Sequence, residues 1–218
     1  MEGIGDGIVV LFAAVAVVYG IVMVITKKLP LYFQLSVAAV ACLMLGYLFD
    51  ICDYMVNGVL EGGYVIGCLG SIGSFLFLLT ASIGYIDGII DDGSPAIKKC
   101  RVIALIAPAL VLVLWGINMI ANVSMDTKAV YTALWIPAAF SSYFNLKHAI
   151  IPDFDFGFIK AIKPYNIFLL LLSFSELLCL TAWDYYYPVQ IAITAITFGI
   201  LCICTMVVAR KGVEKWTI

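Results

Sequence analysis

The acid with the clearest chemical potential in this sequence is Glu176, because it interrupts a long apolar stretch. It stands about 12 residues into residues 164–184, PYNIFLLLLSFSELLCLTAWD. At about 1.5 Å per helical residue, its carboxyl lies about 18 Å from one end of a membrane span whose hydrocarbon depth is about 30 Å. A carboxyl at such a depth is costly unless it faces a protein interior, a water-filled cavity or a partner. Glu176 is therefore the first candidate for a functional site.

Hydroxyl groups are the polar side chains that can meet Glu176 at its depth. Ser173 lies one turn away on the same helical face, and two other apolar stretches carry hydroxyl pairs about eight residues below the same membrane boundary. An unpaired carboxyl in a medium of low dielectric constant favours its protonated form, which can donate a hydrogen bond. Three roles are open for it: a structural hydrogen bond between helices, a ligand-contacting or proton-responsive group in an outward-opening pocket, and a catalytic acid. The predicted ligand-binding set, with no catalytic residue assigned, is Glu176, Ser173, Ser71, Ser74, Thr194 and Thr197.

Side chains of metal-binding or redox type do not combine into a site in the sequence. Asp50 and Asp53 share a helical face at a membrane boundary, but nothing nearby supplies the further ligands that a cation needs. The seven cysteines contain no zinc-type pair, and we interpret them as packing groups. His148 is the single histidine, which excludes a site with several histidine ligands, and we predict it to be a loop residue. No metal and no cofactor are therefore expected.

The elements that must position these groups are membrane-spanning helices. The chain has 64% hydrophobic and only 12% charged residues, with a mean hydropathy of +1.12, which is too little polar surface to cover a soluble globule. A single all-α domain over residues 1–218 is predicted, with one bundle of seven transmembrane helices. Their predicted spans are residues 7–26, 30–50, 63–87, 102–121, 128–145, 164–184 and 188–209.

The basic residues predict the orientation of the bundle. All twelve except Lys128 follow the first, third, fifth and seventh apolar stretches. Because Lys and Arg are retained on the cytoplasmic side, this alternation places the N-terminus outside and the C-terminus in the cytoplasm, and we expect the plasma membrane. Glu176 then lies about eight residues, or roughly 12 Å, below the outer boundary.

Glycine and proline shape three of the predicted spans. Gly63, Gly67, Gly70 and Gly73 recur at helical spacing in the third span, which predicts close helix packing or, alternatively, a groove that small groups line for a ligand. Pro108 in the fourth span and Pro137 in the fifth span each remove a backbone donor and predict a kink. The connection over residues 145–163 mixes aromatic residues with lysines, and we predict that it lies along the inner membrane surface.

Known seven-helix families do not account for the sequence. The seventh span has no lysine for a retinal Schiff base, and neither the DRY nor the NPxxY motif of G-protein-coupled receptors is present. Ser175-Glu176-Leu177 is a partial match to lysoplasmalogenase-like membrane hydrolases, but no second buried acid or membrane histidine is evident in the sequence. We therefore assign the chain to no family.

The leading hypothesis is a receptor-like or sensor-like protein with an outward-facing polar pocket around Glu176, which signals through a separate partner. A small-molecule or proton-coupled transporter or channel is the alternative, and an intramembrane enzyme acting on a lipid is the third. The sequence favours a non-enzymatic role, because it offers no nucleophile and general base that lie at compatible depths in the membrane. Expected partners are the lipid bilayer, a small-molecule or lipid ligand, and a membrane or cytoplasmic protein, with no nucleic acid.

Overall fold

The described part of the chain is helical, with no strand among its residues. The computed structural model describes residues 2–27, 29–58, 63–87, 93–120, 125–152, 157–184 and 188–214. Its elements are α1 (Glu2–Lys27), α2 (Leu31–Asn57), α3 (Gly63–Ala81), the π-helix η1 (Ser82–Asp87), α5 (Pro95–Ala104), α6 (Ile106–Ile120), α7 (Met125–Ile150), α8 (Gly157–Asp184) and α9 (Pro188–Glu214). The all-α class predicted from the sequence is confirmed.

Five of the helical segments are long and apolar enough to cross a membrane. They are Ile4–Lys27, Leu31–Asn57, Pro95–Ile120, Ile162–Thr181 and Val189–Gly212. The apolar segment Ile66–Ala81 within α3 is shorter than these five. Helix α7 is long enough, but its second half carries many polar side chains. These findings support an integral membrane protein.

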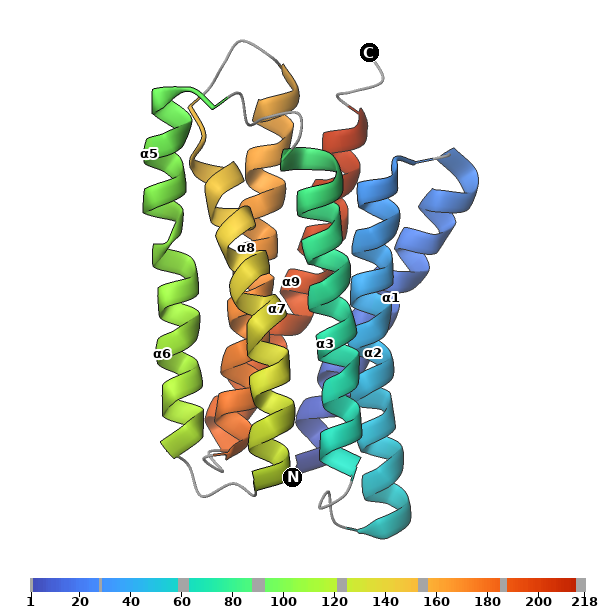
Figure 1. The fold of residues 1–218 in the computed structure, drawn as a ribbon. Helices are drawn as coiled ribbons and strands as arrows, with labels where there is room; N and C mark the ends of the chain where they lie inside the picture. The colour runs from blue at the N-terminus through green and yellow to red at the C-terminus, as the bar shows by residue number, and fades with distance from the viewer. Residues whose placement is uncertain are drawn as a thin grey trace.

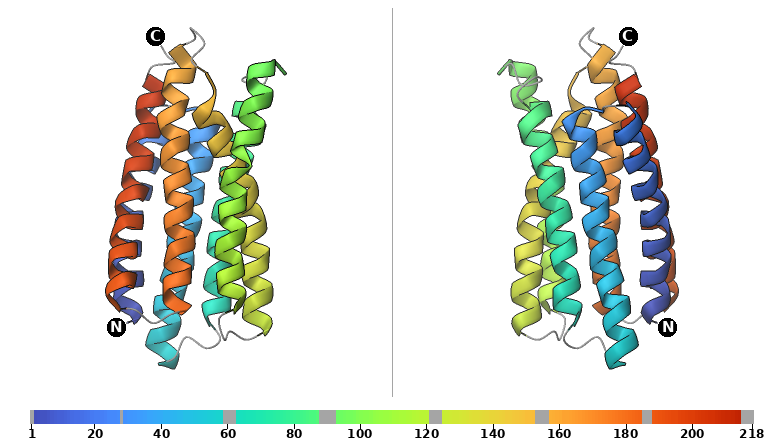
Figure 2. Two further views of the ribbon diagram at one scale, coloured as in Figure 1. Left: turned by 90° about the vertical axis from the view of Figure 1, so that its left-hand side faces the viewer. Right: turned by 90° about the vertical axis from the view of Figure 1, so that its right-hand side faces the viewer.

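The helices stand side by side in one bundle, with the two chain termini at opposite ends (Figures 1 and 2). We call these the N-terminal end and the C-terminal end of the bundle. Helices α2 and α3 share the most extensive contact, followed by α8 with α9 and α1 with α2. The largest fully buried side chains include Phe33, Phe75, Tyr131, Tyr165 and Phe198, so aromatic rings fill much of the interior.

Glycines bring α2 and α3 close together. A Cβ atom on Gly46 would lie 2.5 Å from the carbonyl oxygen of Gly67, and one on Gly70 would lie 2.5 Å from the carbonyl oxygen of Cys42. Only glycine allows backbones to approach this closely. Within lipid the hydrophobic effect does not drive helices together, so close packing at small residues stabilises their contacts instead. Of the two alternatives for the glycine series, the close helix packing is therefore the one observed.

Several helices extend beyond the predicted spans. Helix α2 continues to Asn57, so Asp50 lies inside the helix rather than at its end. Residues 145–150 belong to α7 and residues 157–163 belong to α8, so the prediction of a surface connection over residues 145–163 is wrong for both flanks, while residues 153–156 lie outside the described residues. Polar residues in this region predicted that the chain leaves the membrane here, whereas the structure buries Asn145, Lys147 and His148 between helices.

The helix is broken near the first of the two prolines that predict a kink, whereas the kink at the second stays a prediction. The α5 and α6 segments are separated at Leu105, whose amide donates to Val102 at 3.2 Å in a tightened turn. This break lies just before Pro108, whose ring cannot coexist with a regular hydrogen bond to residue 104. Pro137 lies inside α7 without interrupting its helical assignment.

Candidate functional site

Glu176 of α8 is buried between α2 and α3, with 1% of its surface exposed. The hydroxyl of Tyr47 donates a hydrogen bond to its Oε2 atom at 2.9 Å. The hydroxyl of Ser71 donates a second hydrogen bond to its Oε1 atom. Both carboxyl oxygens therefore accept hydrogen bonds from neutral donors on different helices, which is how a buried carboxylate can be stabilised without a cation. The structure thus brings together the predicted pair Glu176 and Ser71.

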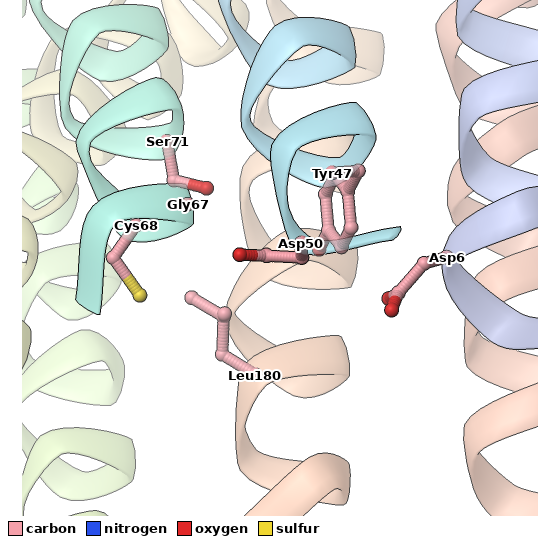
Figure 3. A pocket seen from close by; sticks show the side chains of 7 residues that line it. All are labelled: Asp6, Tyr47, Asp50, Gly67, Cys68, Ser71 and Leu180. Atoms are coloured by element: carbon pink, nitrogen blue, oxygen red, sulfur yellow. The ribbon is translucent and has the colours of Figure 1, made fainter. Parts of the chain in front are cut away.

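A second acid, Asp50, lies one helical turn from Tyr47 on α2. Only 7% of its surface is exposed, and its buried Oδ1 atom has no hydrogen-bond partner among the residues that the structure describes. Figure 3 shows its carboxyl pointing from α2 towards Gly67 and Cys68 on α3. A Cβ atom on Gly67 would overlap this carboxyl, so glycine is what gives the acid its room. Asp50, which the sequence places at a membrane boundary, is therefore a buried residue that α3 covers.

The space between these groups is a small cavity, which we call the acid cavity. Its volume is about 10 Å³, enough for about one water molecule. The unpartnered Oδ1 atom of Asp50 is a polar group that such a water could satisfy. The cavity is lined by Asp6, Tyr47, Asp50, Gly67, Cys68, Ser71 and Leu180.

Asp6 of α1 is the second carboxyl that lines the acid cavity, beside Asp50, while Glu176 is not among the lining residues. Its exposed fraction is 3%, and in Figure 3 it projects from α1 towards α2, on the side of Asp50 and Tyr47 away from α3. Asp6 and Glu176 are both within electrostatic range of Asp50. Among the described residues, no group of three or more histidine, cysteine or acidic side chains has an arrangement that could hold a metal ion. Like charges at this depth repel one another.

The remaining predicted ligand-binding residues lie apart from this hydrogen-bonded centre. Ser173 is buried, and its hydroxyl donates to the carbonyl of Leu169 on its own helix at 2.8 Å. Ser74 is buried one turn further along α3 than Ser71. Thr194 and Thr197 donate to the carbonyls one turn earlier on α9, at 2.7 and 2.9 Å, and Thr197 is exposed. The ligand-binding role of these four residues stays a prediction.

Sequence reasoning missed Asp6 and Tyr47 and considered Asp50 only as a cation ligand. Its conclusion that no second buried acid is evident is wrong, because Asp50 and Asp6 are both buried. The three-residue spacing of Tyr47 and Asp50 was a usable signal, because it places a phenol and a carboxyl on one face of α2. Asp6 gave no comparable signal, since an acid near the start of a span resembles an ordinary boundary residue. Its role depends on α1 packing beside α2, which no local pattern encodes.

A second polar cluster lies near the C-terminal end of the bundle, where η1 meets α7. The Oδ1 atom of Asp87 lies 2.5 Å from Lys147 Nζ and 3.0 Å from His148 Nε2. Lys147 and His148 are 2% and 1% exposed. The prediction that His148 is a loop residue is therefore wrong: it is a buried residue of α7, and the carboxylate of Asp87 compensates the charge of its neighbour Lys147.

Replacing Asp87 by asparagine is expected to destabilise the protein by about 1–2 kcal/mol, because the buried charge of Lys147 would lose its ion pair with this carboxylate. The quarter exposure of the Asp87 side chain (26%) keeps the loss below that of a fully buried pair. Chemical unfolding of the purified protein in detergent measures the difference. Asp53→Asn is the matched control, because Asp53 pairs only with Asn57 on its own helix among the described residues. Equal stability of the two variants would contradict the prediction.

Comparisons of the chain with protein-family models, with curated proteins and with solved structures find no match.

Proposed function

We propose that this protein is an intramembrane hydrolase that cleaves an ester or ether bond of a lipid, using a water molecule held in the acid cavity. The observation that carries the proposal is the unequal environment of two neighbouring acids: Glu176 accepts two hydrogen bonds, whereas one oxygen of the buried Asp50 has no partner. Two carboxyl groups in different environments are what general acid–base hydrolysis requires. A water-sized space supplies the position for the second reactant, and it is lined by Asp50 and by Tyr47 and Ser71, the two residues that donate to Glu176.

The roles of the two acids follow from their hydrogen bonds. Tyr47 and Ser71 stabilise a negative charge on Glu176, so this residue acts as the base that removes a proton from water. Asp50 lacks such donors at Oδ1 and acts as the acid that holds a proton. Asp6 is a further acid that lines the cavity beside Asp50.

The reaction balances with water as the only co-reactant. The water oxygen forms a bond to the substrate carbon while one water proton passes to Glu176. The bond between this carbon and the leaving oxygen breaks, and the proton of Asp50 passes to that oxygen. The proton on Glu176 then returns to Asp50, which restores the starting state. One lipid and one water yield two products that each carry a hydroxyl or carboxyl group.

A lipid is the substrate class that fits the surroundings of the site. The cavity lies within a helical bundle whose outer surface is largely apolar, with many exposed leucine, isoleucine and valine side chains. A molecule that reaches such a site from the bilayer must itself partition into lipid. Because water also has to reach the acids, we place the scissile bond near the headgroup of the lipid rather than along its acyl chains.

The same proposal includes seven membrane crossings with the N-terminus outside. Helices α3 and α7 would add two crossings to the five apolar segments, and termini at opposite ends of the bundle suit an odd number. The basic residues Lys98, Lys99, Arg210 and Lys211 lie towards the C-terminal end, which suits the cytoplasm. The acid cavity then faces the outer leaflet, and we retain the plasma membrane as the location.

A receptor-like or sensor-like role remains a prediction from the sequence, together with its partner protein. A preformed pocket for a small molecule has a volume of about 300–1,000 Å³. The acid cavity is far smaller, so it suits a water or a proton better than a small-molecule ligand. The unequal environment of the two buried acids is why we place hydrolysis before reception.

Proton-coupled transport is the second candidate, favoured by the three neighbouring acids Asp6, Asp50 and Glu176. The same groups that move protons in hydrolysis could pass them across the membrane. Transport requires a net flux between two compartments, whereas hydrolysis requires a new product. The two candidates therefore separate in one preparation.

The test uses purified protein in liposomes that contain a panel of ester- and ether-linked phospholipids and lysophospholipids. Mass spectrometry of the lipids measures hydrolysis, and a pH-sensitive dye inside the liposomes measures proton flux. We expect a cleaved lipid with the wild type and about 10²–10⁴-fold slower cleavage with Glu176→Gln. Proton flux that depends on Glu176 without any cleaved lipid would overturn hydrolysis in favour of transport. Neither product nor flux in the folded wild type would overturn both.

Gly67→Ala is expected to reduce hydrolysis about 10²-fold, since an acid displaced by about 1 Å loses that much rate. The new methyl group would overlap the carboxyl of Asp50, which can swing away without moving the backbone. The rate constant measures the effect, and thermal unfolding should show a far smaller change. Gly7→Ala is the control, because a Cβ atom there meets nothing within 4 Å. Equal activity of the two variants would contradict this positioning role of Gly67.

A further inference from the structure

A pair of exposed lysines stands above an apolar surface on α5, far from the acid cavity. Lys98 and Lys99 line an open hollow together with Val102 and Ile103. The spacing places each lysine one helical turn from an apolar side chain, on the same face. We call these four residues the lysine shelf. The hollow has a volume of about 450 Å³, comparable to that of a site for a small organic group.

The apolar half of the lysine shelf continues down the outer surface of the bundle. Val102 and Ile103 are 68% and 50% exposed, and Leu105, Ile106 and Leu110 extend the exposed surface along α5 and α6. The segment Pro95–Ile120 is the least buried of the five membrane-length helices. Because its outward face has no helix beside it in the bundle, acyl chains of the bilayer are its natural neighbours (Figure 1).

The two lysines carry positive charge that the described residues do not neutralise. Neither Lys98 nor Lys99 forms an ion pair within the described ranges, in contrast to Lys147 with Asp87. The positive end of the helix dipole lies one turn away, at Ser94 and Pro95, where it adds to the attraction for an anion. The shelf therefore offers two cationic donors at the level where the apolar surface begins, which is where a lipid phosphate lies.

We propose that the lysine shelf binds an anionic phospholipid, with its phosphate on Lys98 and Lys99 and its acyl chains along Val102 and Ile103. Charge complementarity selects an anionic headgroup over a zwitterionic one, because the latter brings a positive group towards the lysines. The continuous apolar face below the lysines suits acyl chains, which a soluble anion lacks. This site is separate from the acid cavity and does not depend on the proposed hydrolysis.

The experiment measures lipid binding by native mass spectrometry of the protein released from detergent micelles. The micelles contain phosphatidylglycerol and phosphatidylcholine at equal concentration. We expect wild type to retain phosphatidylglycerol in preference to phosphatidylcholine. In Lys98→Gln/Lys99→Gln the ratio of bound phosphatidylglycerol to bound phosphatidylcholine should fall at least about tenfold, as expected for the loss of two lysines near a lipid headgroup. Lys98→Arg/Lys99→Arg should retain it, because the charge is preserved.

Lys27→Gln/Lys211→Gln is the matched control, since both of these lysines are exposed near the same end of the bundle. It removes the same charge and should leave the preference close to wild type. An equal loss in both double variants would overturn the shelf in favour of a general charge effect. An unchanged preference in Lys98→Gln/Lys99→Gln would also overturn it. The proposal would also be overturned if wild type were a dimer and Lys98→Gln/Lys99→Gln a monomer, because a second copy of the chain would then occupy the surface.

Discussion

Gly70→Ala is expected to destabilise the protein by about 2–3 kcal/mol, whereas Gly116→Ala should change its stability by less than about 0.5 kcal/mol. A Cβ atom on Gly70 would lie 2.5 Å from the carbonyl oxygen of Cys42 and 2.7 Å from the Cα atom of Gly46. Both neighbours are backbone atoms of α2, so no side chain can rotate away to relieve the overlap. The helices would have to separate along the most extensive contact in the bundle.

Gly116 provides the control because it is also a helical glycine but a Cβ atom there meets nothing within 4 Å. The two variants therefore make the same chemical change and the same change in helix propensity. Reversible unfolding in mixed detergent micelles measures the free energy of each variant. If Gly70→Ala were as stable as Gly116→Ala, the close approach of α2 and α3 would be contradicted.

Glu176→Gln and Asp50→Asn are each expected to reduce the rate of lipid hydrolysis about 10²–10⁴-fold, the usual contribution of a general base or acid. Glutamine keeps an oxygen that can accept from Tyr47 or Ser71, but it cannot remove a proton from water. Asparagine keeps the size of Asp50 but has no acidic proton to give to the leaving oxygen. The structural change is small in both variants, so the loss reports on chemistry.

The double variant Glu176→Gln/Asp50→Asn tests whether the two acids act as a unit. Residues of one catalytic unit show non-additive losses, so the double variant should be little slower than the worse single variant. Product formation under single-turnover conditions gives the rates, and thermal unfolding confirms that each variant is folded. Fully additive losses would indicate two independent functions, and retained activity in Asp50→Asn would remove this acid from the mechanism.

Glu176 and Ser71 could be predicted from the sequence because their signals are local. A carboxyl within an uninterrupted apolar stretch needs a polar partner wherever the helices pack. Matching depth along antiparallel spans then points to a small set of hydroxyls, of which the structure pairs Ser71 with the acid. The depth of a residue in the membrane does not reveal which face of its helix it occupies, however. Thr197 was predicted at the depth of Glu176, but it is exposed on the outer side of α9.

Asp50 and His148 could not be placed because the sequence does not reveal what packs over the ends of a helix. Acids and bases near the end of an apolar stretch usually mark the membrane boundary. Here Gly67 lets α3 cover Asp50, and Asp87 on the π-helix η1 reaches Lys147 and His148. Both arrangements depend on contacts between separate helices, so the pattern within one span predicts an exposed residue where the structure has a buried one.

The measurement that tests the central claim most directly is the pH dependence of kcat/KM for lipid hydrolysis in wild type, Glu176→Gln and Asp50→Asn. A base must be ionised and an acid must be protonated, so the wild-type profile should be bell-shaped. We expect Glu176→Gln to lose the limb that rises with pH and Asp50→Asn to lose the limb that falls at higher pH. A flat wild-type profile, or a bell unchanged by Asp50→Asn, would contradict an acid–base pair in the acid cavity.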